Sequence, residues 1–484
     1  MNTILITSVV LYLVATLGLG LWAGTRIKNT SDFAVAGRSL PLIMVVTTTF
    51  ATWFGAETVM GIPAKFVQGG LNALVEDPFG AGSCLILVGL FFAAKLYKLN
   101  LLTIGDYYRA RYGKGIEIFC SSAIILSYLG WVAAQITALG LVFSVLTNGA
   151  MSETVGMIVG TLAVLVYVVV GGFLAVAITD FIQMIVLVIG LSVIAFYAAD
   201  LAGGTAPVLA MATKGDLWRF WPAPTMTEIF AFIGAGVTMM FGSIPQQDVY
   251  QRVMSAKNAP TARAGAVIGG ASYIMFAFVP MFVVAAAVVV MGQDAMDIAK
   301  NDYQRLLPTF VLTKMPLAMQ ILFFGALLSA IKSTSSATLL APSTSFVENI
   351  LFNIRPEMSD KQRLFAMRVS IVVFAAIVLA YAIAMKGTSI YELVSSAYQV
   401  TLVGAFVPLV MGLYWKRATT QGAIASVVTG IAVWVVSFPQ LSNLSAVFPG
   451  QLAGLIAAFV AMVAGSLLPQ VLENRHDKTK TLAA

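Results

Sequence analysis

A lysine and a row of hydroxyl side chains lie inside an apolar stretch of the chain. The segment SAIKSTSSAT, Ser329 to Thr338, is preceded by QILFFGALL and followed by LLAP. This pattern predicts a transmembrane helix with polar side chains at mid-depth, where an uncompensated charge costs roughly 2.5 to 3.5 kcal/mol on insertion scales. Such residues usually mark an ion or substrate path. The alternative is that the hydroxyls bond to their own helix and serve only helix packing.

The composition indicates an integral membrane protein. Of the 484 residues, 59% are hydrophobic and 10% are charged, whereas a soluble domain averages about 25% charged residues. Cys84 and Cys120 lie in apolar runs and form no disulfide or metal pattern, and His476 is the only histidine. We therefore expect neither an enzyme nor an organic cofactor. The net charge of +7 does not indicate nucleic-acid binding, because the basic residues sit in short loops between apolar runs.

Apolar runs of roughly 20 residues, long enough to cross a bilayer, recur along the whole chain. The first is too long for a cleaved signal peptide and is interpreted as a retained helix. Thirteen spans are predicted, near 3–25, 41–63, 77–96, 116–147, 153–171, 173–200, 227–249, 260–291, 319–351, 364–386, 390–415, 420–438 and 449–472.

The distribution of basic residues predicts the orientation in the membrane. Of 28 Lys and Arg residues, twenty fall on the side of the C-terminal tail and seven on the other side, with Lys332 left in the membrane. Because loops rich in Lys and Arg stay in the cytoplasm, we expect the N-terminus outside and the C-terminus inside a plasma or inner membrane.

Two of the predicted spans are interrupted by glycine, proline and polar residues. The second reads IMVVTTTFATWFGAETVMGIPAKF, and the seventh reads AFIGAGVTMMFGSIPQQDVYQR. Broken segments in corresponding places of two halves indicate a transporter binding site, because unwound backbone frees carbonyl oxygens and is tolerated only where it lines a protein cavity. For one interrupted helix, close packing of small residues would be the better interpretation. For two, five spans apart, we favour a binding site.

The motifs in these segments resemble the sodium/solute symporter family, which includes proline, sugar, sialic acid and choline transporters. GRSL and FATWFGAETVMGIPA resemble its first core helix, and GGFLAVAITDFIQ resembles its GG-x-x-AV-x-x-TD-x-x-Q signature. QQDVYQRVMSAKN resembles its Q-x-x-x-QR loop, and SAIKSTSSATLLAPSTSF resembles its sodium-site helix. The motifs run in order from Gly37 to Phe346.

The resemblance implies an all-α membrane protein with the LeuT-type fold, a single transporter domain over residues 1–484. The expected parts are a leading helix (3–25), a first inverted repeat (41–200), a second inverted repeat (227–415), two trailing helices (420–472) and a cytoplasmic tail (473–484).

The resemblance also implies a sodium site. Its hydroxyl pair falls on Ser333 and Thr334, and its backbone carbonyls fall on Ala330, Ala51 and Phe54. A hard cation prefers a cage of oxygen ligands, and none of these positions needs a charged side chain. Sodium would therefore be held between the broken second span and the ninth span.

Three ionisable residues near this site are candidates for ion coupling. Asp180 matches the family's acidic residue below the sodium site, where it would attract or release the ion; the alternative is a carboxylate that snorkels to the membrane surface. Lys332 is a departure, because the proline and choline transporters have methionine there. We expect either Glu57 or a carboxylate on the solute to compensate Lys332, which would favour an anionic or zwitterionic solute.

The substrate pocket is predicted from the aromatic cage of the choline branch, since aryl faces attract quaternary ammonium groups. Trp53 and Trp131 match two cage tryptophans, whereas Gln246 and Ala81 replace a third tryptophan and a tyrosine. This half-cage with added charges argues against choline itself. The further candidates, for which ordinary helix packing is an equal alternative, are Tyr128, Gln135, Tyr398 and Gln399.

We therefore expect a symporter that imports a small organic solute, such as an amino acid, a carboxylate or an amine, together with Na⁺. The partners are the solute, the ion and the lipid bilayer, and we expect no nucleic acid and no obligate protein partner. Two alternatives stay open. One is a transporter-like sensor domain, although only a short polar tail follows the last span. The other is a proton-coupled or Na⁺-independent transporter in which Lys332 takes the cation's role.

Overall fold

Long apolar segments in a bilayer must satisfy their backbone hydrogen bonds internally, which favours helices. The computed structural model describes residues 3–438 and 448–472, and within these ranges the chain is a bundle of helices with one isolated β-bridge. The expected tail, 473–484, lies outside the described residues.

The α-helices are α1 (Thr3–Gly24), α2 (Thr30–Val35), α3 (Leu42–Trp53), α4 (Ile62–Gly69), α5 (Ala81–Leu87), α6 (Ala93–Lys98), α7 (Ile104–Tyr112), α8 (Lys114–Leu146), α9 (Glu153–Leu201), α10 (Thr205–Lys214), α11 (Met226–Gly242), α12 (Gln247–Ser255), α13 (Ala259–Met291), α14 (Gln293–Asn301), α15 (Leu306–Lys314), α16 (Leu317–Ser345), α17 (Phe352–Ile354), α18 (Asp360–Ala384), α19 (Ile390–Thr401), α20 (Val407–Tyr414), α21 (Thr420–Val436) and α22 (Gly450–Leu467). The 3₁₀ segments are η1 (Ala36–Arg38), η3 (Leu71–Leu74) and η6 (Tyr303–Arg305), and the π segments are η2 (Glu57–Gly61), η4 (Val75–Gly80), η5 (Val88–Phe92), η7 (Phe346–Leu351) and η8 (Leu402–Phe406).

Within the described ranges, nine helical segments are long and apolar enough to cross a membrane, and two bent pairs raise this number to eleven. Two shorter apolar helices, Glu153–Val166 and Thr420–Val436, coincide with the fifth and twelfth predicted spans. The membrane-spanning, all-helical architecture is thus confirmed, whereas the number of thirteen spans stays a prediction. The division into inverted repeats also stays a prediction.

Both predicted interruptions are real bends. The helix α3 meets the η2–α4 segment at 57°, and α11 meets α12 at 45°. Each bent pair stands at the start of one predicted repeat. The two are tied together where the amide of Leu40 donates to Ser255 O and the amide of Lys257 donates to Leu40 O.

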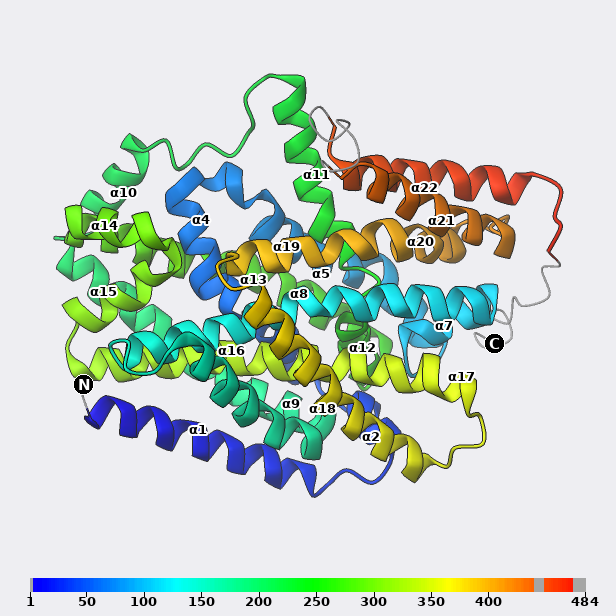
Figure 1. Ribbon diagram of the computed structural model, residues 1–484, viewed down its shortest axis with the longest axis horizontal. Helices are drawn as coiled ribbons and strands as arrows, with labels where there is room; N and C mark the ends of the chain where they lie inside the picture. Colours follow the sequence, from blue (N-terminus) through cyan, green and yellow to red (C-terminus); the bar gives the residue numbers. More distant parts are fainter. Residues whose placement is uncertain (1–2, 439–447, 473–484) are drawn as a thin grey trace.

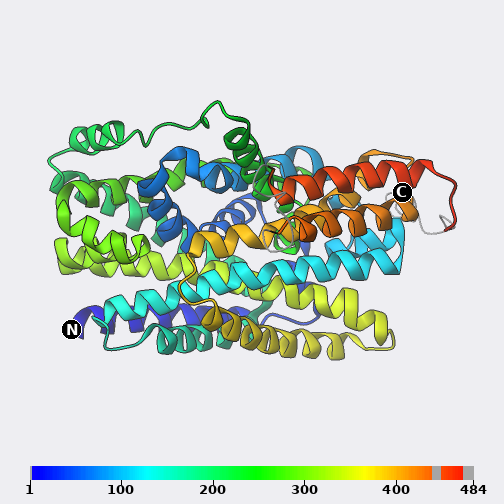
Figure 2. The same ribbon diagram turned by 45° about the horizontal axis from the view of Figure 1, so that its top comes forward.

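The long helices pack side by side in a broad bundle (Figure 1). The first helix, α1, lies along one edge against α9 and α16, and α21 pairs with α22 at the opposite edge. Figure 2 shows the stretch around α10, in green, running over the outside of this bundle. Several short helices connect the spans, such as α7 with its Thr103–Asp106 capping box, and the count of apolar runs did not include them.

The boundary between the fifth and sixth predicted spans is a single glycine inside α9. Gly172 has φ 49° and ψ −157°, and its neighbours continue as helix on both sides. A Cβ there would lie 2.5 Å from Phe33 Cδ2 and 2.7 Å from Phe33 O. Glycine is therefore required twice, for the backbone conformation and for the close approach of α2.

Candidate functional site

The break after α3 frees backbone oxygens beside the hydroxyl pair of α16. Helix α3 ends at Trp53, and Phe54 has the non-helical dihedrals φ −91° and ψ 67°. Ala51 is in the last turn, where carbonyls lack a partner from their own helix. Its carbonyl accepts hydrogen bonds from Ser333 Oγ at 3.1 Å and Thr334 Oγ1 at 3.5 Å. These three residues therefore meet as the predicted sodium site requires.

The remaining predicted ligands occupy suitable backbone positions. Phe54 is the residue at the break, and Ala330 lies one turn before Thr334 on α16 and is buried. The other hydroxyls of α16 behave differently, because Ser335, Ser336 and Thr338 donate to carbonyls of their own helix. The packing interpretation thus applies to these three, while Ser333 and Thr334 turn towards α3.

Asp180 lies at this site rather than at the membrane surface. It is fully buried in α9 and accepts hydrogen bonds from Ser333 Oγ at 2.5 Å and Thr48 Oγ1 at 2.6 Å. The snorkelling alternative is therefore wrong. A carboxylate that shares Ser333 with the carbonyl of Ala51 adds a negative charge next to the neutral oxygens.

Four buried aromatic rings form a cluster next to the same break at the end of α3. Trp53 comes from α3, Trp131 and Tyr128 from α8, and Tyr398 from α19. The ring of Trp131 lies 5.3 Å from that of Trp53, 5.6 Å from that of Tyr398 and 6.1 Å from that of Tyr128 between centroids. Tyr128 and Tyr398 thus join the two predicted tryptophans, which makes the aromatic site larger than the expected half-cage.

Glu57 belongs to this aromatic cluster. Its Oε1 accepts from Trp131 Nε1 at 2.9 Å, and its Oε2 accepts from Gln135 Nε2 at 2.6 Å. Gln135 Oε1 in turn accepts from the amide of Ala56, so one side chain fixes both the carboxylate and the start of η2. The positive end of a helix favours a carboxylate in its first turn.

The aromatic cluster and the predicted sodium ligands are neighbours at Gly55. A Cβ on this glycine would lie 2.6 Å from both Glu57 Oε2 and Thr334 Oγ1, and 2.9 Å from Gln135 Oε1. The carboxylate of the cluster and a hydroxyl of the sodium site therefore approach one point on the unwound backbone.

A second carboxylate, which the sequence reasoning missed, reaches the cluster from the other bent helix. Asp248 follows the break between α11 and α12. Its Oδ1 accepts a hydrogen bond from Tyr128 OH at 2.5 Å, and its backbone amide donates to the Tyr128 hydroxyl oxygen at 2.9 Å. Tyr128 and Trp131, one turn apart on α8, therefore each hold a carboxylate from a different broken helix. The signal was present in the QQDVYQR motif.

Arg252, one turn after Asp248, is the buried cation of this region. It donates to the carbonyl of Asp248 at 2.8 Å and to Thr52 Oγ1, and its charge acts on both Asp180 and Asp248. Three buried carboxylates, Glu57, Asp180 and Asp248, thus surround the two sites, and Arg252 offsets one of them.

Lys332 does not take part in this arrangement. Its Nζ donates to Thr16 Oγ1 on α1 at 2.6 Å, and the side chain lines a cavity of about 130 Å³ between α1, α8, α9 and α16. Glu57 is held by α8 instead. The expected pairing of Glu57 with Lys332 is therefore wrong in this structure, because successive residues on a helix point about 100° apart and Lys332 faces α1.

The two predicted glutamines have different positions. Gln246 is the residue before α12, at the break. Its Nε2 donates to Ser127 Oγ at 2.8 Å, and its buried Oε1 has no hydrogen-bond partner among the described residues. Gln399 accepts from Trp434 Nε1 at 3.1 Å on the trailing helix α21. Gln246 thus lies beside the cluster, whereas Gln399 contacts a trailing helix and its role in solute binding stays a prediction.

A pair of buried acidic residues, Glu76 and Asp77, also escaped the sequence reasoning. Asp77 Oδ1 accepts from Tyr273 OH at 2.5 Å, and Glu76 Oε2 accepts from Ser395 Oγ at 2.6 Å. Tyr273 also contacts Thr58 Oγ1 at 3.0 Å, which links this pair to the helical segment that carries Glu57. The only sequence signal was two adjacent acidic residues within an apolar run.

Comparisons with known proteins agree on the class of protein. The chain is 27% identical over 443 residues to the human high affinity choline transporter 1, covering 88% of this chain and 75% of that protein. It is 25% identical over 498 residues to the sodium/pantothenate symporter of Haemophilus influenzae, covering 99% of both.

The fold is shared with solved transporter structures. A Na⁺-coupled sialic acid symporter in a substrate-bound outward-open state matches with a TM-score of 0.82 at 21% identity, covering 98% of this chain and 99% of that chain. A nucleobase-cation-symport-1 family transporter matches with a TM-score of 0.55 at 17% identity, covering 93% and 98%. These likenesses confirm the LeuT-type fold.

The profile of the sodium:solute symporter family matches residues 33–430, most of the chain. This match includes both bent helices, the hydroxyl pair of α16 and the aromatic cluster. The relatives are multi-pass membrane transporters rather than enzymes, and their family supports Na⁺ as the coupling ion. The chain therefore belongs to the sodium:solute symporter family.

Proposed function

We propose that this protein is a sodium-coupled symporter that imports a small organic cation, a solute with a quaternary or protonated ammonium group. The observation that carries the proposal is the charge balance of the two neighbouring sites. In their ionised forms, Glu57, Asp180 and Asp248 bring three negative charges and Arg252 brings one positive charge. Na⁺ and the ammonium group of the solute would offset this excess of negative charge, to which the buried Asp77 beside Glu57 adds, and buried charges require such compensation.

Sodium would bind to Ser333 and Thr334 side chains and to carbonyls of Ala51, Phe54 and Ala330, with Asp180 as a charged neighbour. Both hydroxyl oxygens lie close to Ala51 O, at 3.1 Å for Ser333 and 3.5 Å for Thr334, and these contacts support the assignment because they bring the ligands of α16 and α3 together. Hydroxyl and carbonyl oxygens are the ligands that a hard cation prefers.

The ammonium group of the solute would lie among Trp53, Trp131, Tyr398 and Tyr128, with Glu57 as its counter-ion. Aromatic faces attract cations, by roughly 2 kcal/mol or more when the pair is desolvated. The rings contact one another closely in this structure, so solute binding would separate them. Gln246 Oε1, which is buried and has no partner in the part of the chain that the structure describes, would accept a hydrogen bond from the rest of the solute.

An anionic solute is disfavoured by the same geometry. The lysine that would have served as its counter-ion bonds to Thr16 on α1, while the aromatic cluster contains a carboxylate. The similarity to choline transporters is compatible with a cationic solute. Gln246 and Ala81, which replace two aromatic cage residues, argue for a cation other than choline.

The first test measures sodium coupling in proteoliposomes. Uptake should require an inward Na⁺ gradient, and Ser333→Ala should raise the Na⁺ concentration for half-maximal uptake by about tenfold, equivalent to one lost ligand of about 1.4 kcal/mol. Ser336→Ala is the matched control, because this hydroxyl bonds to the carbonyl of Ser333 in its own helix. Equal uptake without Na⁺ under a proton gradient would contradict sodium coupling and favour proton coupling.

The second test measures equilibrium binding of labelled choline, betaine, primary amines, carboxylates and sugars to purified protein. Ammonium solutes should bind, and Glu57→Gln should weaken their affinity by roughly 10- to 100-fold, as expected for a charge-assisted contact of 1.5 to 3 kcal/mol. The control is Glu392→Gln, because this carboxylate is 59% exposed and lies at the surface. Selective binding of carboxylates or sugars, or unchanged affinity in Glu57→Gln, would refute the cation assignment.

A further inference from the structure

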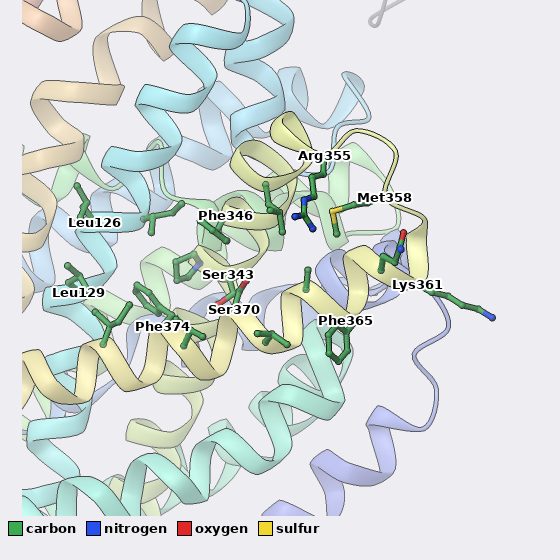
Figure 3. Close-up of a pocket in the computed structure, with 18 of the residues that line it drawn as sticks. Leu126, Leu129, Ser343, Phe346, Arg355, Met358, Lys361, Phe365, Ser370 and Phe374 are labelled. Carbon is green, nitrogen blue, oxygen red and sulfur yellow. The ribbon is translucent and has the colours of Figure 1, made fainter.

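A large groove lies outside the transport site, between α8, the end of α16 with η7, and α18. Its volume is about 950 Å³ (Figure 3). The lining is mainly apolar and includes Leu126, Leu129, Phe346, Val369 and Phe374. In Figure 3 the side chains of Phe346 and Phe374 face the space between α18 and its neighbours.

One end of the groove is basic. Arg355 and Lys361 line this end together with Glu357. In Figure 3 the guanidinium of Arg355 reaches towards the groove from the turn before α18, while Lys361 extends away from its mouth. Lys114 is close by, since its Nζ donates to Asn353 O at 2.8 Å. Of the charged residues that line the groove, two are basic and one is acidic, so this end attracts an anion.

The rest of the groove faces the bilayer. Phe365, Val373 and Ile377 of α18 are 67%, 52% and 52% exposed, and on a helix that crosses a membrane such side chains meet lipid. The lining follows α18 from Lys361 to Ile377, roughly 24 Å at 1.5 Å per residue. This length is similar to one leaflet with its headgroups, roughly 20 to 22 Å.

We propose that this groove is a binding site for an anionic phospholipid of the cytoplasmic leaflet. The phosphate of the headgroup contacts Arg355, Lys361 adds positive charge at the mouth, and an acyl chain lies along Val369 and Phe374. Basic pockets between helices on the cytoplasmic side are suited to such headgroups. The positive net charge at the mouth of the groove favours an anionic lipid over a zwitterionic one. The long apolar lining along α18 favours a lipid over a soluble anion.

Bound lipid would also contact the helix that carries the sodium ligands. Pro342 and Ser343 line the groove, and both belong to α16, as do Ser333 and Thr334. Lipid binding should therefore stabilise the folded transporter in detergent, because a ligand that binds only the native state raises its stability.

The test uses delipidated full-length protein in detergent, titrated with dioleoylphosphatidylglycerol or dioleoylphosphatidylcholine. Bound lipid is counted by native mass spectrometry, and thermal unfolding is measured in parallel. Phosphatidylglycerol should bind more tightly and raise the unfolding temperature. Arg355→Gln and Lys361→Gln should each weaken its binding by about fivefold, the effect of about one surface cation. Val369→Trp, which fills the groove at a bilayer-facing position, should remove the bound lipid.

Lys416→Gln is the matched control, since Lys416 is an exposed lysine outside the groove on the same predicted side of the membrane. The proposal is overturned if this control weakens binding as much as Arg355→Gln does, or if phosphatidylcholine binds equally well. It is also overturned if soluble glycerol phosphate stabilises the protein to the same extent, or if Val369→Trp keeps its lipid. Each readout is independent of the transported solute.

Discussion

At the scale of single residues, α8 presents two aromatic donors to two carboxylates. Trp131 holds Glu57 from the first broken helix, and Tyr128 holds Asp248 from the second. The two rings are stacked with an interplanar angle of 14°. A solute that inserts between the rings would therefore change the contacts of both broken helices at once, which is one physical route from solute binding to helix movement.

Lys332→Met provides a residue-scale prediction. Because its ammonium bonds to Thr16 and not to Glu57, this variant should keep the solute affinity and the Na⁺ requirement within about twofold, less than the 1.4 kcal/mol that a tenfold change requires. Proteoliposome uptake checks this expectation, with Thr16→Val as the matched variant at the other end of the hydrogen bond. Strong loss of Na⁺ dependence, with recovery on adding Glu57→Gln, would restore the pairing of Lys332 with Glu57.

At the scale of elements, the interruptions decide where chemistry can occur. At the break after α3 and at the break before α12, the backbone leaves the helical conformation inside the bundle. Each break is followed by a buried carboxylate, Glu57 in the first case and Asp248 in the second. The break inside α9 has a different role. Gly172 changes the direction of the chain, and the second half of the helix then places Asp180 next to Ser333. Helix α2 packs against the turn at Gly172.

Gly172→Ala should therefore destabilise the protein strongly. The backbone at φ 49° and ψ −157° costs an alanine about 1 to 3 kcal/mol, and the new Cβ would also collide with Phe33. Gly203→Ala is the control, because Gly203 has φ 78° but nothing within 4 Å of the added Cβ. The half-inactivation temperature in detergent should fall clearly more for Gly172→Ala. Equal losses would mean that strain alone, without the contact to Phe33, determines the effect.

At the scale of the whole molecule, the exposed apolar side chains are gathered on the outer helices. Val14 on α1, Val373 on α18 and Val460 on α22 are all more than half exposed, at 59%, 52% and 63%. In contrast, Trp53 and Trp131 are buried at 1% exposure. The outer helices thus present apolar side chains outward, while Glu57, Asp180, Asp248 and Arg252 are buried inside the bundle, as expected for a solute path through a bilayer.

The predicted orientation can be tested with single cysteines. Cys84 and Cys120 are both fully buried, so the background labelling of the native chain should be low. In intact cells, an impermeant maleimide should label Lys300→Cys, a residue of α14 on the predicted outer side, but not Lys416→Cys. Both should react after permeabilisation. Labelling of Lys416→Cys alone in intact cells would reverse the topology, because the positive-inside rule would then not hold here.

The sequence alone determined the membrane setting and the two interrupted helices. These features depend on composition and local pattern: hydrophobic length defines a span, and glycine and proline mark where a helix breaks. The choice of Ser333 and Thr334 came instead from the resemblance to the symporter family. The break at Gly172 was also placed correctly, since the double glycine separates two apolar runs.

Only the tertiary structure decided which polar groups meet. Lys332 and Ser333 are neighbours in sequence, yet one bonds to α1 and the other to α3 and α9. Likewise, Asp248 and Glu57 come from distant segments and converge on one face of α8. A helix turns each residue about 100° from the one before it, and the position of the neighbouring helices then determines whether that direction leads to an ion, a solute or a packing contact.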